Sequence, residues 1–324
     1  MVSTFAALTH CIERELHDVQ RLFDLEVESR ITCVNDLVRH VGRFRGKMLR
    51  PMLVLFSGSA SGGLTRDHVT IAAVVEMVHM ATLVHDDVLD EAELRRKGAT
   101  INHLRGNEAA VLLGDYLISH SYHLCSSLDS QFCSRTIART TNEVCEGELL
   151  QINNRGRLDL DEKTYYQIIT GKTASLCGAC CLLGAKLSGA DDQAVARMDR
   201  FGRCLGEAFQ IQDDILDLVG DVKEVGKTLG TDIEKSKMTL PMIHFMHHAP
   251  RQHRELLQSL LESRDADKVE RIRNLIVPSS SIPYAQQRAS ERCEEAVGIL
   301  ESLPESEARR ALELAARLVV DRPM

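Results

Sequence analysis

The sequence predicts an all-α protein. Its seven prolines leave a gap from Pro51 to Pro241, and proline is disfavoured inside helices. Within that gap apolar residues recur mostly at helical spacing, and the alternation typical of strands is hard to find. We identify no linker, low-complexity tract or repeat array. We therefore predict a single domain, residues 1–324.

Composition limits the possible functions. The net charge is −8 with no block rich in Lys and Arg, which argues against a nucleic-acid partner. The ten cysteines show no metal-binding spacing, as expected for reduced thiols in a cytoplasm. Residues 1–20 do not resemble a targeting signal, and no uncharged apolar run reaches about 18 residues. We predict a soluble cytoplasmic protein without a membrane span.

The predicted elements follow from apolar spacing and from glycine and proline positions. Gly62 and Gly63 separate the first helices from a long apolar one, and Gly220 ends another. In chain order we expect two amphipathic helices in 3–40, a helix start near Pro51, helices over 67–94, 107–129 and 133–152, one beginning near 159–162, one from about 191 to 220, a polar loop over 223–237 and amphipathic helices after 250.

Aspartates cluster near the end of the helix predicted over residues 67–94. Asp86 and Asp90 lie four residues apart and share a helix face, with Asp87 beside them. Three neighbouring carboxylates repel one another and are stabilised by bound cations. We therefore predict that this cluster binds a divalent ion such as Mg²⁺, which readily completes its ligand shell with phosphate oxygens.

A second copy of this DDxxD pattern, formed by Asp213, Asp214 and Asp217, closes another apolar helical run. One such match arises by chance in roughly one chain in ten of this composition, and two in fewer than about one in a hundred. The alternative interpretation, in which both motifs are merely solvent-exposed helix ends, therefore explains the two copies poorly.

Several cationic side chains precede or follow the Asp motifs in the sequence. Lys47 and Arg50 precede a helix start, while Arg95 and Arg96 follow the first Asp cluster. Each is ordinary by itself, because most such residues face solvent or pair with acids. Lys172 and Thr173 stand in an apolar helix, where a lysine is expected to face a polar cavity rather than the core.

Taken together, these residues resemble the trans-type polyprenyl diphosphate synthases, which join isoprenyl units head to tail. The similarity runs from about Gly46 to Pro241, with His79–Gly98 and Gly206–Asp217 as the two Asp-rich regions. The resemblance implies an all-α bundle around a deep central cavity, a homodimer, and three Mg²⁺ ions. It further implies two substrates, isopentenyl diphosphate and an allylic diphosphate.

The resemblance also implies roles for individual residues. Metal would be bound by Asp86, Asp90 and Asp213. The catalytic set would be Asp86, Asp87, Asp90, Asp213, Asp214, Asp217, Lys172 and Lys227. The allylic diphosphate would contact Arg95, Lys172, Thr173, Gln210, Lys227 and Lys237, and isopentenyl diphosphate would contact Lys47, Arg50, His79 and Arg96. Two departures from the family pattern, at Arg45 with Met48 and at Lys97, are expected to change affinity only modestly.

The resemblance implies that product length depends on the residues that precede Asp86 on its helix, where bulky aromatic residues limit the product in short-chain members. Here Ala81, Thr82 and Val78 are small, so we predict a product longer than farnesyl. Small packing residues without a role in length are the alternative interpretation.

Other functions remain as alternatives. A farnesyl or geranylgeranyl diphosphate synthase would share every motif. A class I terpene cyclase would not need the isopentenyl site, a metal-buffering protein would not need the cations, and a non-catalytic partner subunit is expected to lack one Asp cluster. Peripheral membrane contact for product release is compatible with the sequence.

Overall fold

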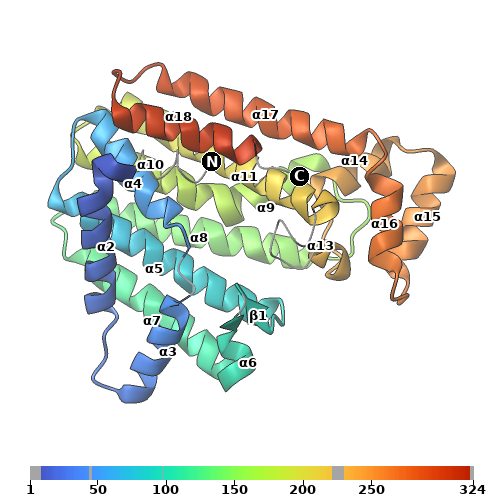
Figure 1. The fold of residues 1–324 in the computed structure, drawn as a ribbon, viewed down its shortest axis with the longest axis horizontal. Helices are drawn as coiled ribbons and strands as arrows, with labels where there is room; N and C mark the ends of the chain where they lie inside the picture. The colour runs from blue at the N-terminus through green and yellow to red at the C-terminus, as the bar shows by residue number, and fades with distance from the viewer. Residues whose placement is uncertain (1–8, 44–45, 97, 221–229, 322–324) are drawn as a thin grey trace. The chain divides into compact units, whose positions relative to one another are not determined.

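In a computed structural model, the described part of the chain comprises residues 9–43, 46–96, 98–220 and 230–321. It is all-α apart from one short hairpin, which confirms the predicted fold class (Figure 1). In order the elements are η1 (His10–Ile12), α2 (Glu13–Glu26), α3 (Thr32–Gly42), α4 (Leu49–Ser61), α5 (Arg66–Leu89), β1 (Leu94–Arg95), β2 (Gly98–Ala99), α6 (Ile101–Arg105), α7 (Asn107–Ser126), α8 (Gln131–Asn153), α9 (Glu162–Ile169), η2 (Thr170–Ala174), α10 (Ser175–Leu187), α11 (Asp192–Val219), α13 (Thr231–Glu234), α14 (Leu240–His248), α15 (Arg251–Glu262), α16 (Lys268–Ile276), α17 (Ser281–Leu300) and α18 (Glu307–Val320).

The chain divides into two compact units. Unit 1 comprises Met1–Asn142, Leu176–Gly202 and Leu300–Leu314, and unit 2 comprises Glu143–Ser175, Arg203–Ile299 and Ala315–Met324. The single domain over 1–324 remains a prediction.

In unit 1 the central element is α5, which carries the first Asp cluster. It packs against α2, α4 and α7, and Figure 1 shows α5 and α7 side by side. Its residues from Thr70 to Val78 are all buried, and all of them except Thr70 and Glu76 are apolar, as expected for a helix inside a core. This core supports the more accessible C-terminal end of α5, where the aspartates lie.

In unit 2 a second apolar core surrounds the C-terminal part of α11. It includes Ile211, Ile215 and Leu218, together with residues of α9, α14 and α16. The three isoleucine and leucine side chains recur at helical spacing and leave Asp213 and Asp217 on the more accessible side of the helix.

Several local predictions are confirmed at the residue level. Helix α4 begins two residues before Pro51, and Gly62 follows its last residue with a φ of 153°. Asp161 caps α9, because its carboxylate accepts a hydrogen bond from the Thr164 backbone N–H at 2.7 Å. These helix ends were predictable because proline, glycine and aspartate have clear conformational preferences at helix ends.

Two features differ from the sequence-based expectation. The chain after α5 forms an antiparallel hairpin in which Leu94 pairs with Ala99 and Arg95 with Gly98. The polar region predicted as loop over 223–237 contains α13 in its described part. Both elements are too short to produce a periodic signal.

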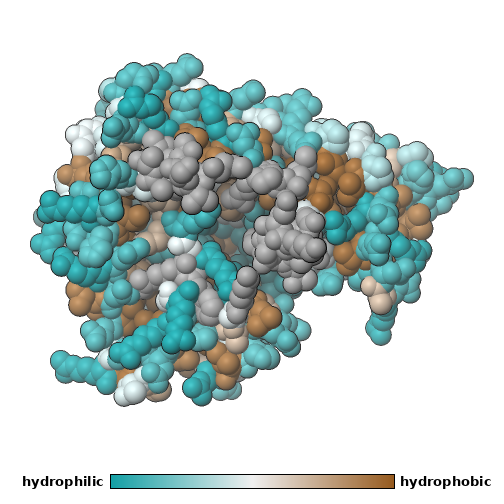
Figure 2. Space-filling view, viewed as in Figure 1, coloured by the Kyte–Doolittle hydropathy of each residue, from teal (hydrophilic) through white to brown (hydrophobic). Residues whose placement is uncertain are grey.

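Two helical stretches are long and apolar enough to cross a membrane by composition alone. They are Arg66–Leu89 and Glu162–Leu187, and 67% and 83% of their most apolar windows are buried within the protein. That degree of burial is typical of core helices. In keeping with such cores, Figure 2 shows mostly hydrophilic surface over α2 and α15.

Candidate functional site

The first Asp cluster contains two kinds of carboxylate. Asp86 and Asp90 are partly exposed at the C-terminal end of α5, whereas Asp87 is buried. Both Nε and Nη2 of Arg95 donate to Oδ1 of Asp87, at 2.9 and 2.8 Å. Asp87 therefore fixes a predicted substrate-binding arginine, while Asp86 and Asp90 present the more accessible oxygens.

The residues predicted for isopentenyl diphosphate also lie in unit 1, where Arg50, His79 and Arg96 are close to one another. Nη1 of Arg50 donates to Nε2 of His79 at 3.0 Å. Burial, together with the positive charges of Arg50, Arg95 and Arg96, lowers the pKa of His79 well below its usual value. His79 is therefore neutral near pH 7 and can accept this hydrogen bond.

The same group has donors suited to an anion. Among the described residues, no acceptor contacts the buried Nε of Arg50. A Cβ atom placed on Gly46 would lie 2.7 Å from Nη2 of Arg96, so glycine allows the Arg96 guanidinium to approach the backbone beside Lys47. The structure thus brings together Arg50, His79 and Arg96, three of the four residues predicted for isopentenyl diphosphate, and Lys47 follows Gly46 in the chain.

The predicted chain-length residues differ in exposure. Ala81 and Val78 have 0% exposed surface, whereas Thr82 is partly exposed. Thr82 lies on the accessible face of α5 with His79 and Asp86. Of the three residues, Thr82 is the one with surface that a bound chain can contact.

The second Asp cluster, in unit 2, again has a buried middle residue. Asp213 and Asp217 are partly exposed, and Asp214 is buried. Oδ1 of Asp217 accepts from the backbone N–H and hydroxyl of Thr231, at 3.3 and 3.1 Å, and Oδ2 accepts from the Asp232 backbone N–H at 3.1 Å. Asp217 therefore stabilises the start of α13, a role that the sequence did not indicate.

Asp214 accepts hydrogen bonds on both carboxylate oxygens. Tyr165 donates to Oδ2 at 2.7 Å and Gln210 donates to Oδ1 at 2.8 Å. Burial and the nearby charge of Asp232 raise the pKa of Asp214 well above its usual value, against the opposing effect of these two bonds. Tyr165 was missed by sequence reasoning, because a tyrosine 49 residues before its partner gives no local signal.

Lys172 and Thr173 lie in a π-helical turn rather than in a regular helix. The turn, η2, interrupts the helical run between α9 and α10, and such insertions are frequent at functional sites. Lys172 forms an ion pair with Glu148 of α8, and Thr173 donates to Oε1 of Gln210 at 2.9 Å. Unit 2 thus brings together three of the residues predicted for the allylic diphosphate.

Of the two remaining lysines predicted to contact the allylic diphosphate, the structure describes only Lys237. Lys237 is mostly buried, and its Nζ lies 3.9 Å from Oδ1 of Asp232. Lys227 lies outside the described residues. Lys237 therefore lies beside Asp232, the α13 residue whose backbone N–H donates to Asp217.

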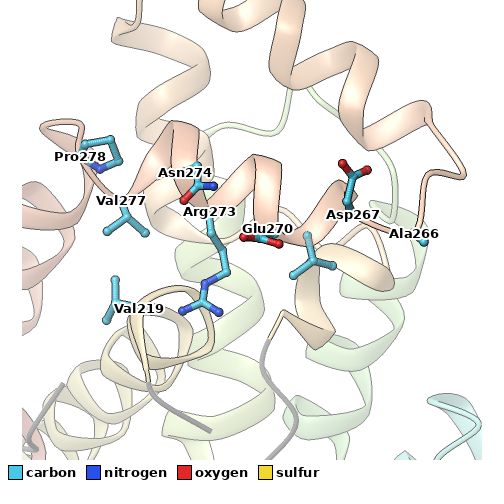
Figure 3. Close-up of a pocket in the computed structure, with 9 residues that line it drawn as sticks. Val219, Ala266, Asp267, Glu270, Arg273, Asn274, Val277 and Pro278 are labelled. Atoms are coloured by element: carbon cyan, nitrogen blue, oxygen red, sulfur yellow. The ribbon is translucent and has the colours of Figure 1, made fainter.

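A groove of about 720 Å³ lies beyond the second cluster, at the end of α11 (Figure 3). Arg273 of α16 extends toward Val219, as the close-up shows. Its Nε donates to the Leu218 carbonyl at 2.6 Å and its Nη2 to the Gly220 carbonyl at 3.1 Å. Arg273 therefore caps the helix that carries the cluster.

The accessible carboxylates are chemically suited to a divalent metal ion. Across the part of the chain that the structure describes, no three or more His, Cys, Asp or Glu side chains form a ready-made metal site. Mg²⁺ is usually bound by one or two carboxylates together with substrate phosphate oxygens. The partly exposed oxygens of Asp86, Asp90 and Asp213 fit that mode of binding.

Fold and site together define a class: an all-α protein whose two units each carry an Asp-rich motif at the end of a long helix, with cationic side chains nearby. The family model described as Polyprenyl synthetase matches residues 32–277. The chain is 34% identical over 298 residues to the octaprenyl diphosphate synthase of Escherichia coli, covering 92% of each chain. It therefore belongs to the polyprenyl synthetase family, and the predicted resemblance is confirmed.

Solved structures give the same result for the fold. The decaprenyl diphosphate synthase from Rhodobacter capsulatus matches with a TM-score of 0.93 at 31% identity, covering 98% of this chain and 99% of that one. The polyprenyl synthase from Caulobacter crescentus, complexed with calcium and isoprenyl diphosphate, matches with a TM-score of 0.92 at 31% identity, covering 98% of each chain. The isoprenoid synthase type of fold is thus confirmed.

Proposed function

We propose that this protein is a Mg²⁺-dependent prenyltransferase that condenses isopentenyl diphosphate with an allylic diphosphate, head to tail, into a long trans-polyprenyl diphosphate. One observation carries the proposal: in each DDxxD motif the middle Asp is buried and hydrogen-bonded, whereas the first Asp is partly exposed. Family membership and the long-chain names of the relatives support the same reaction and product class.

The residues have distinct parts in this reaction. Asp86, Asp90 and Asp213 would hold three Mg²⁺ ions. The positive charge of these ions would stabilise the diphosphate as a leaving group. Lys172 and Arg95, both predicted to contact the allylic diphosphate, would each contribute positive charge that stabilises the leaving diphosphate. Its carbon–oxygen bond breaks with the electron pair leaving on oxygen, and an allylic carbocation remains.

The second substrate completes the bond. Arg50, paired with the neutral His79, binds isopentenyl diphosphate and orients its double bond toward the cation. The double bond supplies the electron pair of the new carbon–carbon bond. A proton then leaves the adjacent carbon, restoring a double bond, and the departing diphosphate is its acceptor.

The test uses purified protein, labelled isopentenyl diphosphate and allylic primers of several lengths. We expect Mg²⁺-dependent chain extension with products longer than farnesyl diphosphate, sized by chromatography. Asp86→Asn and Asp213→Asn should each lower kcat by several orders of magnitude. Asp192→Asn is the matched control, because Asp192 lies on α11 with a side chain that is 94% exposed. Turnover without divalent metal, or near wild-type turnover in either site variant, would refute the assignment.

We further propose a homodimer in the cytoplasm. Helix α7 supports the dimer, because Val111 and Leu112 are 42% and 68% exposed on neighbouring positions. Leu112→Asp should shift the mass measured by light scattering toward the monomer. Leu25→Asp, at a leucine that is 63% exposed on α2, should not. Equal behaviour of the two variants would count against α7 as the interface.

A further inference from the structure

Tyr165 begins a buried chain of hydrogen bonds in unit 2. Its side chain belongs to α9 and is 3% exposed, and its hydroxyl donates to Oδ2 of Asp214 at 2.7 Å. The apolar ring alone would suit this core, where Ile168 and Ile211 are also buried. A phenylalanine would fill the same space, so the hydroxyl is the feature that needs an explanation.

The chain continues from Asp214 to Thr173. Gln210 donates its amide N–H to Oδ1 of Asp214 at 2.8 Å, and its amide oxygen accepts from the Thr173 hydroxyl at 2.9 Å. These two contacts fix which end of the Gln210 amide faces which neighbour. Among the described residues, the hydrogen bonds of this network leave unused one amide N–H of Gln210 and the acceptor positions of the Thr173 hydroxyl.

The end of this chain lies beside the residues predicted to bind the allylic diphosphate. Thr173 follows Lys172 on the π-helical turn, and Gln210 is partly exposed one helical turn before Asp213. The bond from Tyr165 holds the Asp214 carboxylate on the buried side of α11. Asp213, the preceding residue, projects about 100° away around the same helix.

We propose that Tyr165 is a positioning residue for diphosphate and metal binding in unit 2. Its hydroxyl orients Asp214, which orients Gln210 and thereby Thr173, without touching substrate itself. This inference rests on the proposed function, because it assigns a role in the binding of the allylic diphosphate. A purely structural tyrosine would instead stabilise the buried carboxylate and leave ligand affinity unchanged.

The test is Tyr165→Phe, which removes one oxygen atom and retains the ring. Tyr166→Phe is the matched control: Tyr166 is the next residue, is half-buried, and its ring faces the Arg292 guanidinium 5.4 Å away rather than Asp214. Calorimetry with Mg²⁺ and a non-reacting thio-analogue of an allylic diphosphate measures binding without turnover. We expect Tyr165→Phe to raise the Kd about tenfold, as for the loss of one buried hydrogen bond. Tyr166→Phe should leave it within about twofold.

A double-mutant cycle tests the connection along the chain. Thr173→Val removes the donor at the far end, and combined with Tyr165→Phe it should raise the Kd by less than the product of the two single effects. The KM for isopentenyl diphosphate should stay near the wild-type value in Tyr165→Phe. Multiplicative effects on the Kd, or equal changes in the KM of both substrates, would overturn the positioning role.

The remaining outcomes distinguish failure of the positioning role of Tyr165 from failure of the proposed prenyltransferase function. If Tyr165→Phe lowers Tm but binds the analogue as the wild type does, the hydroxyl is only structural and the inference is wrong. If the wild-type protein itself binds no allylic analogue with Mg²⁺, the proposed function fails. Should Tyr165→Phe not fold, Asp214→Asn gives the same readout, because the near-isosteric amide has one acceptor oxygen for two donors. It should likewise raise the Kd about tenfold, and an unchanged Kd would overturn the inference.

Discussion

Product length should depend on Thr82, because Thr82 lies on the accessible face of α5. His79, Thr82, Leu83 and Asp86 are partly exposed there, whereas Ala81 is fully buried. Thr82 precedes Asp86 by four residues, or about 6 Å along the helix axis. A chain that grows from a diphosphate held at Asp86 and extends along this face passes Thr82 within its first units.

The two aromatic substitutions should therefore have different effects. Thr82→Phe adds bulk to a partly exposed position and should shorten the product while leaving ionisation chemistry intact. Ala81→Phe instead inserts a ring into a fully packed core, and overpacking costs about 1–3 kcal/mol of unfolding free energy. For a chain of this size we expect a Tm that is roughly 2–10 °C lower.

The assay sizes labelled products from each variant and measures Tm on the same preparations. Thr82→Val is the control, because it keeps the volume and removes only the hydroxyl, which donates to the His79 carbonyl at 2.8 Å. Its product length should match the wild type. A folded Thr82→Phe enzyme with unchanged products would refute this reasoning. So would an Ala81→Phe enzyme of wild-type stability that alone makes shorter chains.

Three further predictions concern single side chains. Arg273→Ala should lower the unfolding free energy by about 1–3 kcal/mol in denaturant titrations, because two helix-end carbonyls lose their donor; an unchanged midpoint contradicts the cap. The depressed pKa of His79 stabilises the folded state above about pH 6.5, and this contribution is lost as the pH falls further. His79→Gln should therefore lose less unfolding free energy than the wild type on acidification. Parallel curves of unfolding free energy against pH for the two proteins would contradict this. Asp87→Asn should raise the KM for the allylic diphosphate about tenfold by loosening Arg95. Its Mg²⁺ half-saturation should change less than that of Asp86→Asn, and an equal change would contradict the separate roles.

Most of the fold could be predicted because helices longer than about ten residues repeat their apolar pattern several times. The predicted helix over 67–94 is α5, and the helix expected from about 191 to 220 is α11. The hairpin at 94–99 and the π-helical turn at 170–174 are too short for any periodicity. The π-helical turn also depends on close packing, because a Cβ on Gly171 would lie 2.9 Å from both the Glu143 carbonyl and the Gly147 Cα.

Site residues were predictable as a set of residue types, but their partners were not. Arg50 and His79 are 29 residues apart, and Tyr165 and Asp214 are 49 apart. Such pairs depend on how helices pack, which local sequence does not encode. Glu148, the ion-pair partner of Lys172, likewise had no distinguishing pattern on α8.

The DDxxD pattern is the clearest case of a difference that only packing reveals. In sequence, Asp86 and Asp87 are equivalent neighbours, and so are Asp213 and Asp214. In the structure the second residue of each pair faces its unit's interior, where Asp87 holds Arg95 and Asp214 holds Gln210. A helix turns by about 100° per residue, so two adjacent carboxylates cannot both face the same ligand. The first Asp of each motif therefore has the more accessible carboxylate, which suits the proposed metal binding, and the second holds a side chain that we propose contacts substrate.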